Sequence, residues 1–240
     1  MTTLFISDLH LHESRPEVTE AFQEFLRTQA QDAQALYILG DFFDVWIGDD
    51  DDSPLATQTA AQLRQVADKG VAIYLMHGNR DFLLGEQFAK NAGAQLIDDP
   101  TIVQLGDRSA VLMHGDTLCT RDVDYMAFRA QVRNPQWQAQ ALAQPLAVRR
   151  HIAMELRNQS KSMSSLKAED IMDVTPEEVV RVLEDSNANL LIHGHTHRPK
   201  HHFLTVNDQS AERIVLGDWH DHGWCLRAEG SELSLESWRL

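Results

Sequence analysis

The chain has 240 residues, of which 43% are hydrophobic, and a formal net charge of −15. A chain of this kind can bury one substantial core, and its negative charge argues against general nucleic-acid binding, so we expect no nucleic-acid partner. Cys119 and Cys225 form no CxxC pair, which indicates neither a disulfide framework nor a thiolate zinc site and favours a reducing cytoplasm.

Five short apolar runs recur along the chain and start at Leu4, Leu36, Ile73, Ala110 and Leu190. Each run holds four or five apolar residues and ends in polar ones, which predicts a strand buried on both faces. The segments between the first three runs have the apolar periodicity of helices. This order predicts βαβ units, so the first three strands should be parallel.

The helices are predicted from apolar spacing and from capping signals. A late helix should have Thr175 as N-cap, Pro176 as its first residue and Glu178 completing a capping box. Alternation within residues 213–240 predicts short closing strands. The apolar positions of the first two helices are Val18, Phe22, Phe25 and Leu26, and then Leu55, Leu63 and Val66.

Residues 122–168 interrupt this alternation of predicted strands and helices, and they are predicted to form a helical insertion. Tyr125, Phe128 and Val132 share one helical face, and Pro135 and Pro145 stand near the predicted joints between helices. Helical insertions beside an active site commonly serve as lids. We therefore expect a single domain, residues 1–240, that carries a lid over its site.

Charge is distributed unevenly between this insertion and the rest of the chain. Residues 121–167 contain eight basic and three acidic side chains, a net charge of +5, so the remainder carries −20. A solvated helical face is the ordinary explanation, but the predicted place of the insertion beside the site favours an anion-binding role. The acidic run Asp49–Asp52 lacks the spaced pattern of a calcium loop and is predicted to be solvated.

Polar side chains follow each of the five predicted strands. Ligands collect at the carboxyl ends of strands in an open α/β sheet, so these side chains should meet. These side chains offer oxygen and nitrogen ligands but no thiolate, a combination that suits Mn, Fe, Co or Zn. No activated serine or cysteine nucleophile stands out among them. The set is Asp8, His10, Asp41, Asp44, Asn79, Arg80, Asp81, His114, Asp116, His193, His195 and His197.

Five sequence blocks within this set carry a specific resemblance. They are DLH at 8–10, GDFFD at 40–44, GNRD at 78–81, HGD at 114–116 and GHTH at 194–197. In their order and in their spread over most of the chain, they resemble the calcineurin-like metallophosphoesterases. The resemblance implies an α/β fold, a layered β-sheet sandwich flanked by helices, and metal-dependent hydrolysis of a bond to phosphorus.

The resemblance also implies which residues act in the site. One of two Mn²⁺ ions would be held by Asp8, His10, Asp41 and His197, and the other by Asp41, Asn79, His114 and His195, so that Asp41 bridges them. Two such cations acidify water, orient phosphorus and neutralise developing charge. Asp41, His195 and Arg80 would be catalytic, with Arg80 facing phosphate oxygens. Asp44, Asp81, Asp116 and His193 are expected to orient the ligands or hold turns.

Over its whole length, the chain closely resembles family members that hydrolyse the pyrophosphate bond of a glycolipid nucleotide, a UDP-linked diacylglucosamine, in lipid A biosynthesis. The similarity implies peripheral attachment to the cytoplasmic face of the inner membrane, and we expect a monomer. No apolar run approaches the roughly 18 residues that a membrane span needs, and no export signal is recognisable. The implied substrate contacts are Asn79, Arg80, Asp122, Ser160, Ser164, Lys167 and His195.

Two other functions stay open at this point. A related enzyme could act on soluble diphosphates or nucleic-acid ends, and a scaffold of the same fold could have lost its chemistry. The presence of all seven implied metal ligands disfavours the scaffold, and the −20 charge outside the insertion disfavours a nuclease. The segment Ile214–Asp218 repeats the strand-end pattern a sixth time and is interpreted as a coincidental match.

Overall fold

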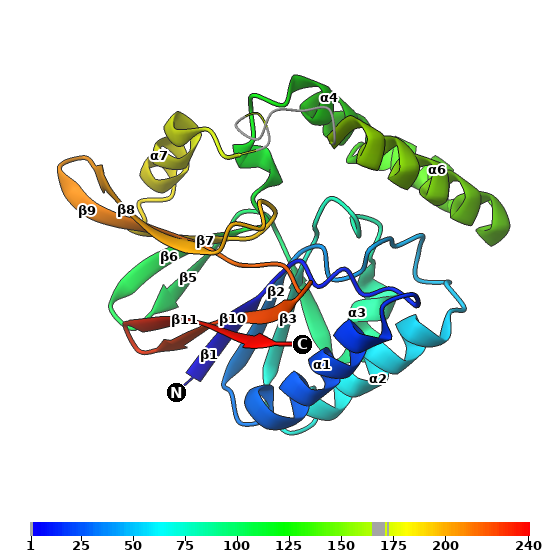
Figure 1. The fold of residues 1–240 in the computed structure, drawn as a ribbon, viewed down its shortest axis with the longest axis horizontal. Helices are drawn as coiled ribbons and strands as arrows, with labels where there is room; N and C mark the ends of the chain where they lie inside the picture. The colour runs from blue at the N-terminus through cyan, green and yellow to red at the C-terminus, as the bar shows by residue number, and fades with distance from the viewer. Residues whose placement is uncertain (1, 165–170, 172) are drawn as a thin grey trace.

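Two β-sheets pack face to face, and helices cover their outer faces (Figure 1). The structure is a computed structural model that describes residues 2–164, 171 and 173–240, with residues 158–164 as backbone only. The first sheet has the strand order β11-β10-β1-β2-β3-β4. Its strands are β1 (Thr2–Ile6), β2 (Ala35–Leu39), β3 (Ala72–Met76), β4 (Ala94–Ile97), β10 (His222–Glu229) and β11 (Glu232–Arg239).

The second sheet has the order β5-β6-β7-β9-β8. Both sheets have a parallel centre, made by β1 to β4 in the first and by β6, β7 and β9 in the second. This confirms the parallel pairing predicted for the first three apolar runs. The strands of the second sheet are β5 (Thr101–Leu105), β6 (Arg108–Met113), β7 (Leu190–His193), β8 (Lys200–Val206) and β9 (Gln209–Val215).

Successive side chains of the central strands enter different layers of the core. In β1, Leu4 and Ile6 pack toward the helices that cover the first sheet, whereas Phe5 packs between the two sheets. In β7, Leu190 and Ile192 pack between the sheets and Leu191 packs on the far side, as the alternation of side chains along a strand requires. Both faces of each sheet are therefore buried, which confirms the layered α/β sandwich.

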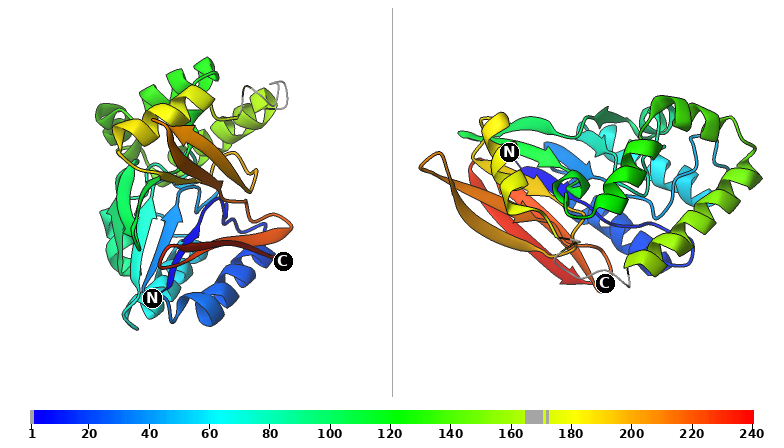
Figure 2. Two further views of the ribbon diagram at one scale, coloured as in Figure 1. Left: turned by 90° about the vertical axis from the view of Figure 1, so that its left-hand side faces the viewer. Right: turned by 90° about the horizontal axis from the view of Figure 1, so that it is seen from above.

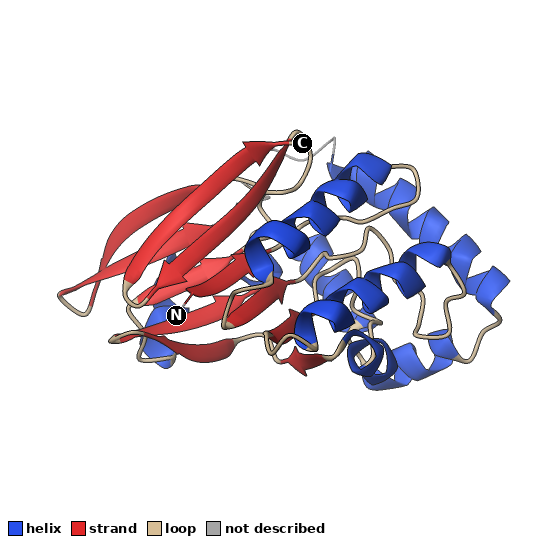
Figure 3. Ribbon diagram, turned by 90° about the horizontal axis from the view of Figure 1, so that it is seen from below, coloured by secondary structure: helices blue, strands red, loops and turns tan. Residues whose placement is uncertain are grey.

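Helices form the outer layers. The first sheet is covered by α1 (Pro16–Phe25), α2 (Pro54–Ala67) and α3 (Glu86–Ala92), and a π-helical turn, η1 (Leu26–Ala30), extends α1. The second sheet is covered by α7 (Pro176–Asp185), which buries Val179, Val182 and Leu183. Figure 3 shows the strands gathered on one side of the molecule and most of the helices on the other.

The predicted insertion contains three helices, α4 (Val123–Val132), α5 (Pro135–Leu142) and α6 (Leu146–Ser164). They follow a short 3₁₀ turn, η2 (Asp116–Leu118), and lie together at one end of the molecule, beyond the carboxyl ends of the strands (Figure 2). Asn134 begins α5 by accepting the backbone N–H groups of Gln136 and Trp137 with its side chain.

The capping box predicted for α7 is not formed. Thr175 is the N-cap residue, but its side chain makes no capping hydrogen bond and instead lies 2.7 Å, Oγ1 to Oγ1, from Thr120. The carboxylate of Glu178 pairs with Arg181 one turn later. Partners elsewhere in the fold and along the helix have therefore replaced the local capping hydrogen bonds.

The acidic run Asp49–Asp52 is a loop in which Asp50 and Asp52 are exposed, as predicted, but its carboxylates also make specific contacts. Asp49 Oδ1 accepts the backbone N–H of Gly85 over 2.8 Å, and Asp49 Oδ2 accepts that of Phe88 over 2.9 Å, so this carboxylate holds the start of α3. Asp50 pairs with Arg149 of α6. The negative charge of the run is therefore used for contacts between segments.

The closing strands are longer than predicted, because β10 and β11 have eight residues each. Three strands were not predicted at all, namely β4, β5 and β8. In β8, for example, Phe203 and Leu204 form the longest apolar run, which is shorter than the four or five residues that predicted five of the other strands. In the described part of the chain, no helix is both long enough and apolar enough to cross a membrane.

Candidate metal centre

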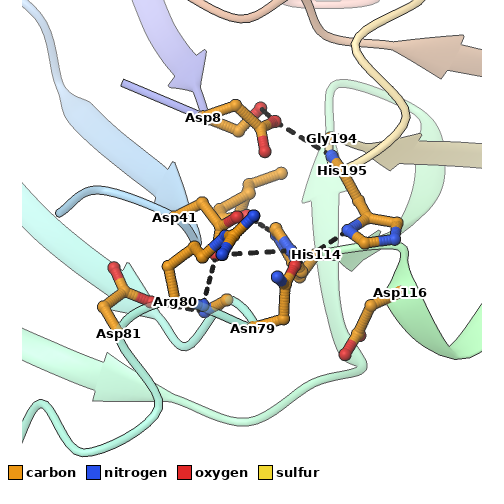
Figure 4. Close-up of polar contacts among 12 residues, drawn as sticks. Asp8, Asp41, Asn79, Arg80, Asp81, His114, Asp116, Gly194 and His195 are labelled. Carbon is orange, nitrogen blue, oxygen red and sulfur yellow. Dashed lines mark hydrogen bonds and ion pairs between the residues drawn. The ribbon is translucent and has the colours of Figure 1, made fainter. Parts of the chain in front are cut away.

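The polar residues that follow the strands lie together at the carboxyl edges of both sheets (Figure 4). Backbone hydrogen bonds join their loops: Asp8 donates to the Gly40 carbonyl over 3.1 Å, and Gly194 donates to the His114 carbonyl over 2.8 Å. Between the sheets, the backbone N–H of His195 donates to Asp8 Oδ2 over 2.9 Å. The loops after four different strands thus form one connected frame.

Five of the predicted ligands have left-handed backbone conformations. Among the described residues, eight that are not glycine have a positive φ, and the other three are Asn187, Asn207 and Asp208. Such conformations cost free energy for L-residues, and they cluster at functional sites where the surroundings hold them. The five ligands are Asp8 (φ 56°), His10 (49°), Asp41 (50°), His195 (68°) and His197 (54°).

Asp8, His10 and His197 form a first group whose ligand atoms all lie within 4.8 Å of one another. His197 Nε2 is 3.3 Å from Asp8 Oδ1 and 3.3 Å from His10 Nε2. Asp8 is fully buried, and its Oδ1 accepts no hydrogen bond within the described part of the chain. A buried carboxylate oxygen of this kind is costly unless a cation lies beside it, so the group fits a metal ion.

Asn79 stands between two imidazoles in the other half of the centre. Its Oδ1 is 2.9 Å from His114 Nε2 and 2.9 Å from His195 Nδ1. His114 Nδ1 donates to the Leu39 carbonyl over 2.9 Å, so Nε2 is the nitrogen that faces Asn79. In the neutral imidazole, the Nε2 lone pair and the amide oxygen would repel each other. A second proton, a cation between them or a rotated amide that turns its NH₂ toward Nε2 would remove this repulsion, and the donor types suit a divalent metal.

Asp41 lies near a histidine in each half of the candidate metal centre. Its Oδ2 is 3.8 Å from His10 Nε2, and its Oδ1 is 3.7 Å from His114 Nε2. Asp41 also forms a second group within 4.8 Å together with Asp8 and His114. Burial, and then the charges of Asp81 and Asp8, raise the pKa of Asp41 to about 7, although His114 opposes them. The carboxylates are crowded enough to need positive charge between them.

The imidazoles differ in pKa according to the carboxylates that they face. Burial lowers the pKa of His10 to about 3 and that of His195 to about 4. Burial also disfavours the charged forms of His114 and His197, but Asp41 beside the first and Asp8 beside the second outweigh it and raise their pKa values to about 9 and about 8. A metal ion can take the place of these protons, because it binds the deprotonated imidazole.

All seven predicted metal ligands are therefore brought together, and the residues expected to support them lie around them. Asp81 joins two loops, since its Oδ1 accepts the Gly78 N–H and its Oδ2 the Phe42 N–H, each over 2.7 Å. Asp116 accepts hydrogen bonds from the Tyr125 hydroxyl and from Arg129 Nε.

Two further residues at the centre were missed or misread in the sequence. Asp218, at the end of the segment interpreted as a coincidental match, has its Oδ2 3.7 Å from His197 Nδ1. That interpretation is wrong, because Ile214 and Val215 are the last residues of β9, a parallel strand of the second sheet, and Asp218 lies in the loop after it, at the same edge. Arg157 of α6 pairs with Asp44 over 2.6 Å, and Asp44 Oδ1 lies 3.8 Å from His10 Nδ1.

The predicted substrate contacts are only partly described. Asn79, Arg80 and His195 lie in the centre, and the Arg80 backbone N–H donates to Asp41 Oδ1 over 2.8 Å (Figure 4). Asp122 is buried as the N-cap of α4, where its side chain accepts the backbone N–H of Tyr125. The side chains of Ser160 and Ser164, and the whole of Lys167, lie outside the described residues.

Most of the basic side chains of the insertion that the structure describes contact the body of the protein, and the anion-binding role expected for the insertion stays a prediction. Arg149 and Arg150 pair with the acidic run, Arg129 with Asp116 and Arg157 with Asp44. Arg133 donates to the carbonyl of Gly78 over 2.8 Å. The opposite charges of the insertion and the body therefore hold the insertion against the body.

Comparison with known proteins agrees with this geometry. A family model described as calcineurin-like phosphoesterase matches residues 1–199, which include all seven ligands. The chain belongs to this family. The phosphoesterase is 64% identical over 240 residues, with 100% of both chains covered, to a protein from Cellvibrio japonicus named UDP-2,3-diacylglucosamine hydrolase. It is 58% identical to a protein of the same name from Marinobacter nauticus, with 97% of this chain and 95% of the relative covered.

The fold of the phosphoesterase is also found among solved structures. Vacuolar Protein Sorting 29 from Cryptosporidium parvum matches with a TM-score of 0.51 and 14% identity, covering 100% of this chain and 91% of the other. At this low identity, the likeness concerns the fold alone.

Proposed function

We propose that the protein hydrolyses the pyrophosphate bond of UDP-2,3-diacylglucosamine in lipid A biosynthesis. Water attacks the α-phosphorus, the bond from that phosphorus to the bridging oxygen breaks, and the products are UMP and 2,3-diacylglucosamine 1-phosphate. The observation that carries the proposal is the 64% identity over the complete length to a relative named for this substrate, together with the convergence of all seven ligands.

The metal centre is proposed to hold two Mn²⁺ ions. Asp8, His10, Asp41 and His197 would bind one, and Asp41, Asn79, His114 and His195 the other. The family relationship supports this division, as does Asp41, whose two oxygens face a histidine of each half. When bound, two such cations supply Lewis acidity for water and for the phosphoryl oxygens.

The protein's own residues would position the diphosphate. Arg80 is proposed to bind its oxygens, because a guanidinium matches phosphate geometry and the charge of Arg80 acts on both Asp41 and His10. Asp41 and His195 are proposed to act with it as catalytic residues. Asn79, His195, Asp122, Ser160, Ser164 and Lys167 are proposed as further substrate contacts from their correspondence with the family.

The helical insertion, residues 122–168, is proposed to be a lid on one domain that spans residues 1–240. A substrate with two acyl chains needs apolar surface beside an anionic site, and the insertion carries apolar side chains that are open to solvent. Examples are Val123, which is 72% exposed, and Met154, which is 56% exposed. The same surface supports peripheral binding of a monomer to the cytoplasmic face of the inner membrane.

The substrate assignment is tested by incubating the purified protein with Mn²⁺ and UDP-2,3-diacylglucosamine in H₂¹⁸O. We expect release of UMP that carries the label, and much slower turnover of ADP-ribose and of an aryl phosphodiester. Label in the sugar phosphate instead would contradict attack on the α-phosphorus. Comparable turnover of all three compounds would contradict the lipid substrate while leaving a phosphoesterase.

Membrane attachment and oligomeric state have their own test. Flotation with vesicles of mixed neutral and anionic phospholipids should carry a fraction of the protein upward, and Met154→Ser should reduce that fraction. Light scattering of the protein without vesicles should give the mass of one 27.2 kDa chain. A protein that stays at the bottom of the gradient, or a dimer mass, would contradict these two proposals.

A further inference from the structure

Helix α4 contacts two of the loops that carry ligands for the second proposed metal. Tyr125, Arg129 and Arg133 follow one another at intervals of four residues, so they share a face of the helix. Tyr125 and Arg129 both contact Asp116, two residues after His114. Arg133, the C-cap residue, contacts Gly78, the residue before Asn79. The first helix of the insertion is therefore bound directly to the metal loops.

The contact of Arg133 bears on the orientation of Asn79. Arg133 Nη2 donates to the Gly78 carbonyl over 2.8 Å. That carbonyl belongs to the peptide unit whose nitrogen is that of Asn79, so the hydrogen bond fixes the plane from which the Asn79 side chain departs. The guanidinium carbon also lies 5.7 Å from the centroid of the Phe82 ring, a cation–π contact that limits the movement of Arg133.

The other side of this turn is already held by carboxylates. Asp81 Oδ1 accepts the Gly78 N–H over 2.7 Å, and Asp41 Oδ1 accepts the Arg80 N–H over 2.8 Å. A Cβ atom at Gly78 would lie 2.1 Å from the backbone nitrogen of Asp41, so the backbone is pressed closely against that residue. The carbonyl of Gly78 is fixed from outside by Arg133. The turn that presents Asn79 is thus held between the body and the insertion.

We propose that Arg133 is a positioning residue that orients Asn79 toward the second metal, so that docking of α4 completes the metal centre. The inference rests on the proposed two-metal function but concerns metal binding itself. It also gives the insertion a role besides covering the substrate, because α4 holds the loops of Asn79 and His114 from one helical face.

The test compares Mn²⁺ binding to the full-length wild type and to Arg133→Met, Arg133→Lys and Arg150→Met by titration calorimetry, with Asn79→Ala as reference. Methionine keeps an apolar stem against Phe82 but loses the donor, whereas lysine keeps one donor. Arg150 is the matched control, an arginine of the insertion that pairs with Asp51 and Asp52, away from the metal loops.

In Arg133→Met, we expect about 10-fold to 100-fold weaker binding in the same step that Asn79→Ala affects, the size typical of losing a residue that orients a metal ligand. The other binding step should be unchanged, kcat should fall with little change in KM, and Arg133→Lys should recover part of both. Arg150→Met should bind both ions as the wild type does.

Unchanged metal binding in Arg133→Met would overturn the inference, as would a change of KM alone. If Arg133→Met does not fold, Arg133→Leu takes its place because it also lacks the donor, and unchanged metal binding in that variant would equally overturn the inference. Failure of the wild type to cleave UDP-2,3-diacylglucosamine would contradict the proposed substrate and leave the binding measurement valid.

Discussion

His195 donates its backbone N–H to Asp8 Oδ2 over 2.9 Å, and this hydrogen bond joins the loop after β7 in the second sheet to the loop after β1 in the first. The two residues are 187 positions apart in sequence. Two sheets that pack face to face can share a metal centre only if such contacts fix their edges relative to each other. The contact also gives the buried Asp8 carboxylate a donor.

Asp218→Asn should weaken Mn²⁺ binding by about 10-fold to 100-fold, because the Asp218 carboxylate lies beside the His197 imidazole and raises its pKa. Binding to the purified variant can be measured by titration calorimetry. The matched control is Asp221→Asn, three residues later, whose carboxylate is exposed and pairs with His220. Equal affinities for the two variants would show that Asp218 has no role at the metal.

Metal binding should become tighter as pH rises from 7 to 9. The folded-state pKa of His114 is about 9, above its ordinary 6.5, so the metal-free protein holds a proton there that the metal must displace. We expect up to about 10-fold tighter binding per pH unit for each proton displaced, with proton release detectable by calorimetry in two buffers. Affinity independent of pH over this range would contradict the proposal.

The raised pKa of His114 should also make the stability of the metal-free protein depend on pH. A raised folded-state pKa means that protonated His114 stabilises the fold fully below pH 6.5, and that this stabilisation is lost as pH rises through about 9. The Tm of the metal-free protein should therefore fall between pH 7 and 9, and saturating Mn²⁺ should remove most of that fall. A Tm that rises over this range would be the contrary result.

Arg149→Met should lower the free energy of unfolding by about 1–3 kcal/mol, because it leaves the buried Ile47 carbonyl without its donor. Urea denaturation of the metal-free protein can measure this. Arg150→Met, which removes a more exposed pair, should change stability by no more than about 0.5 kcal/mol. If both variants are equally stable, Arg149 does not fix the insertion.

The sequence was sufficient to predict that the seven candidate ligands meet, because a rule about strand ends applies to each of them, and the family resemblance selected the seven from the larger polar set. Asp8, Asp41 and His114 each follow an apolar run, and parallel strands bring such ends to one edge. Asp218 obeys the same rule, because it follows β9, although the pattern at Ile214–Asp218 was interpreted as a coincidental match. The strand β8 has no more than two consecutive apolar residues, so it lacks the run of four or five by which five of the other strands were predicted.

Contacts between distant segments account for the features of the fold and the site that the sequence did not predict. Arg157 reaches Asp44 across 113 positions of sequence, and Arg149 reaches Asp50 across 99, and no spacing rule connects such pairs. The basic insertion and the acidic run were each interpreted as separate features, one as an anion site and the other as a solvated loop. Their opposite charges in fact bind them to each other, which only the folded arrangement of the two segments reveals.

The central claim, that side chains from both sheets hold a pair of metal ions around Asp41, is tested most directly by an anomalous difference map from crystals grown with Mn²⁺. We expect two peaks roughly 3.5–4 Å apart, one on each side of Asp41, with Asn79 and His114 at one and His10 and His197 at the other. A single peak, or peaks away from these side chains, would contradict it.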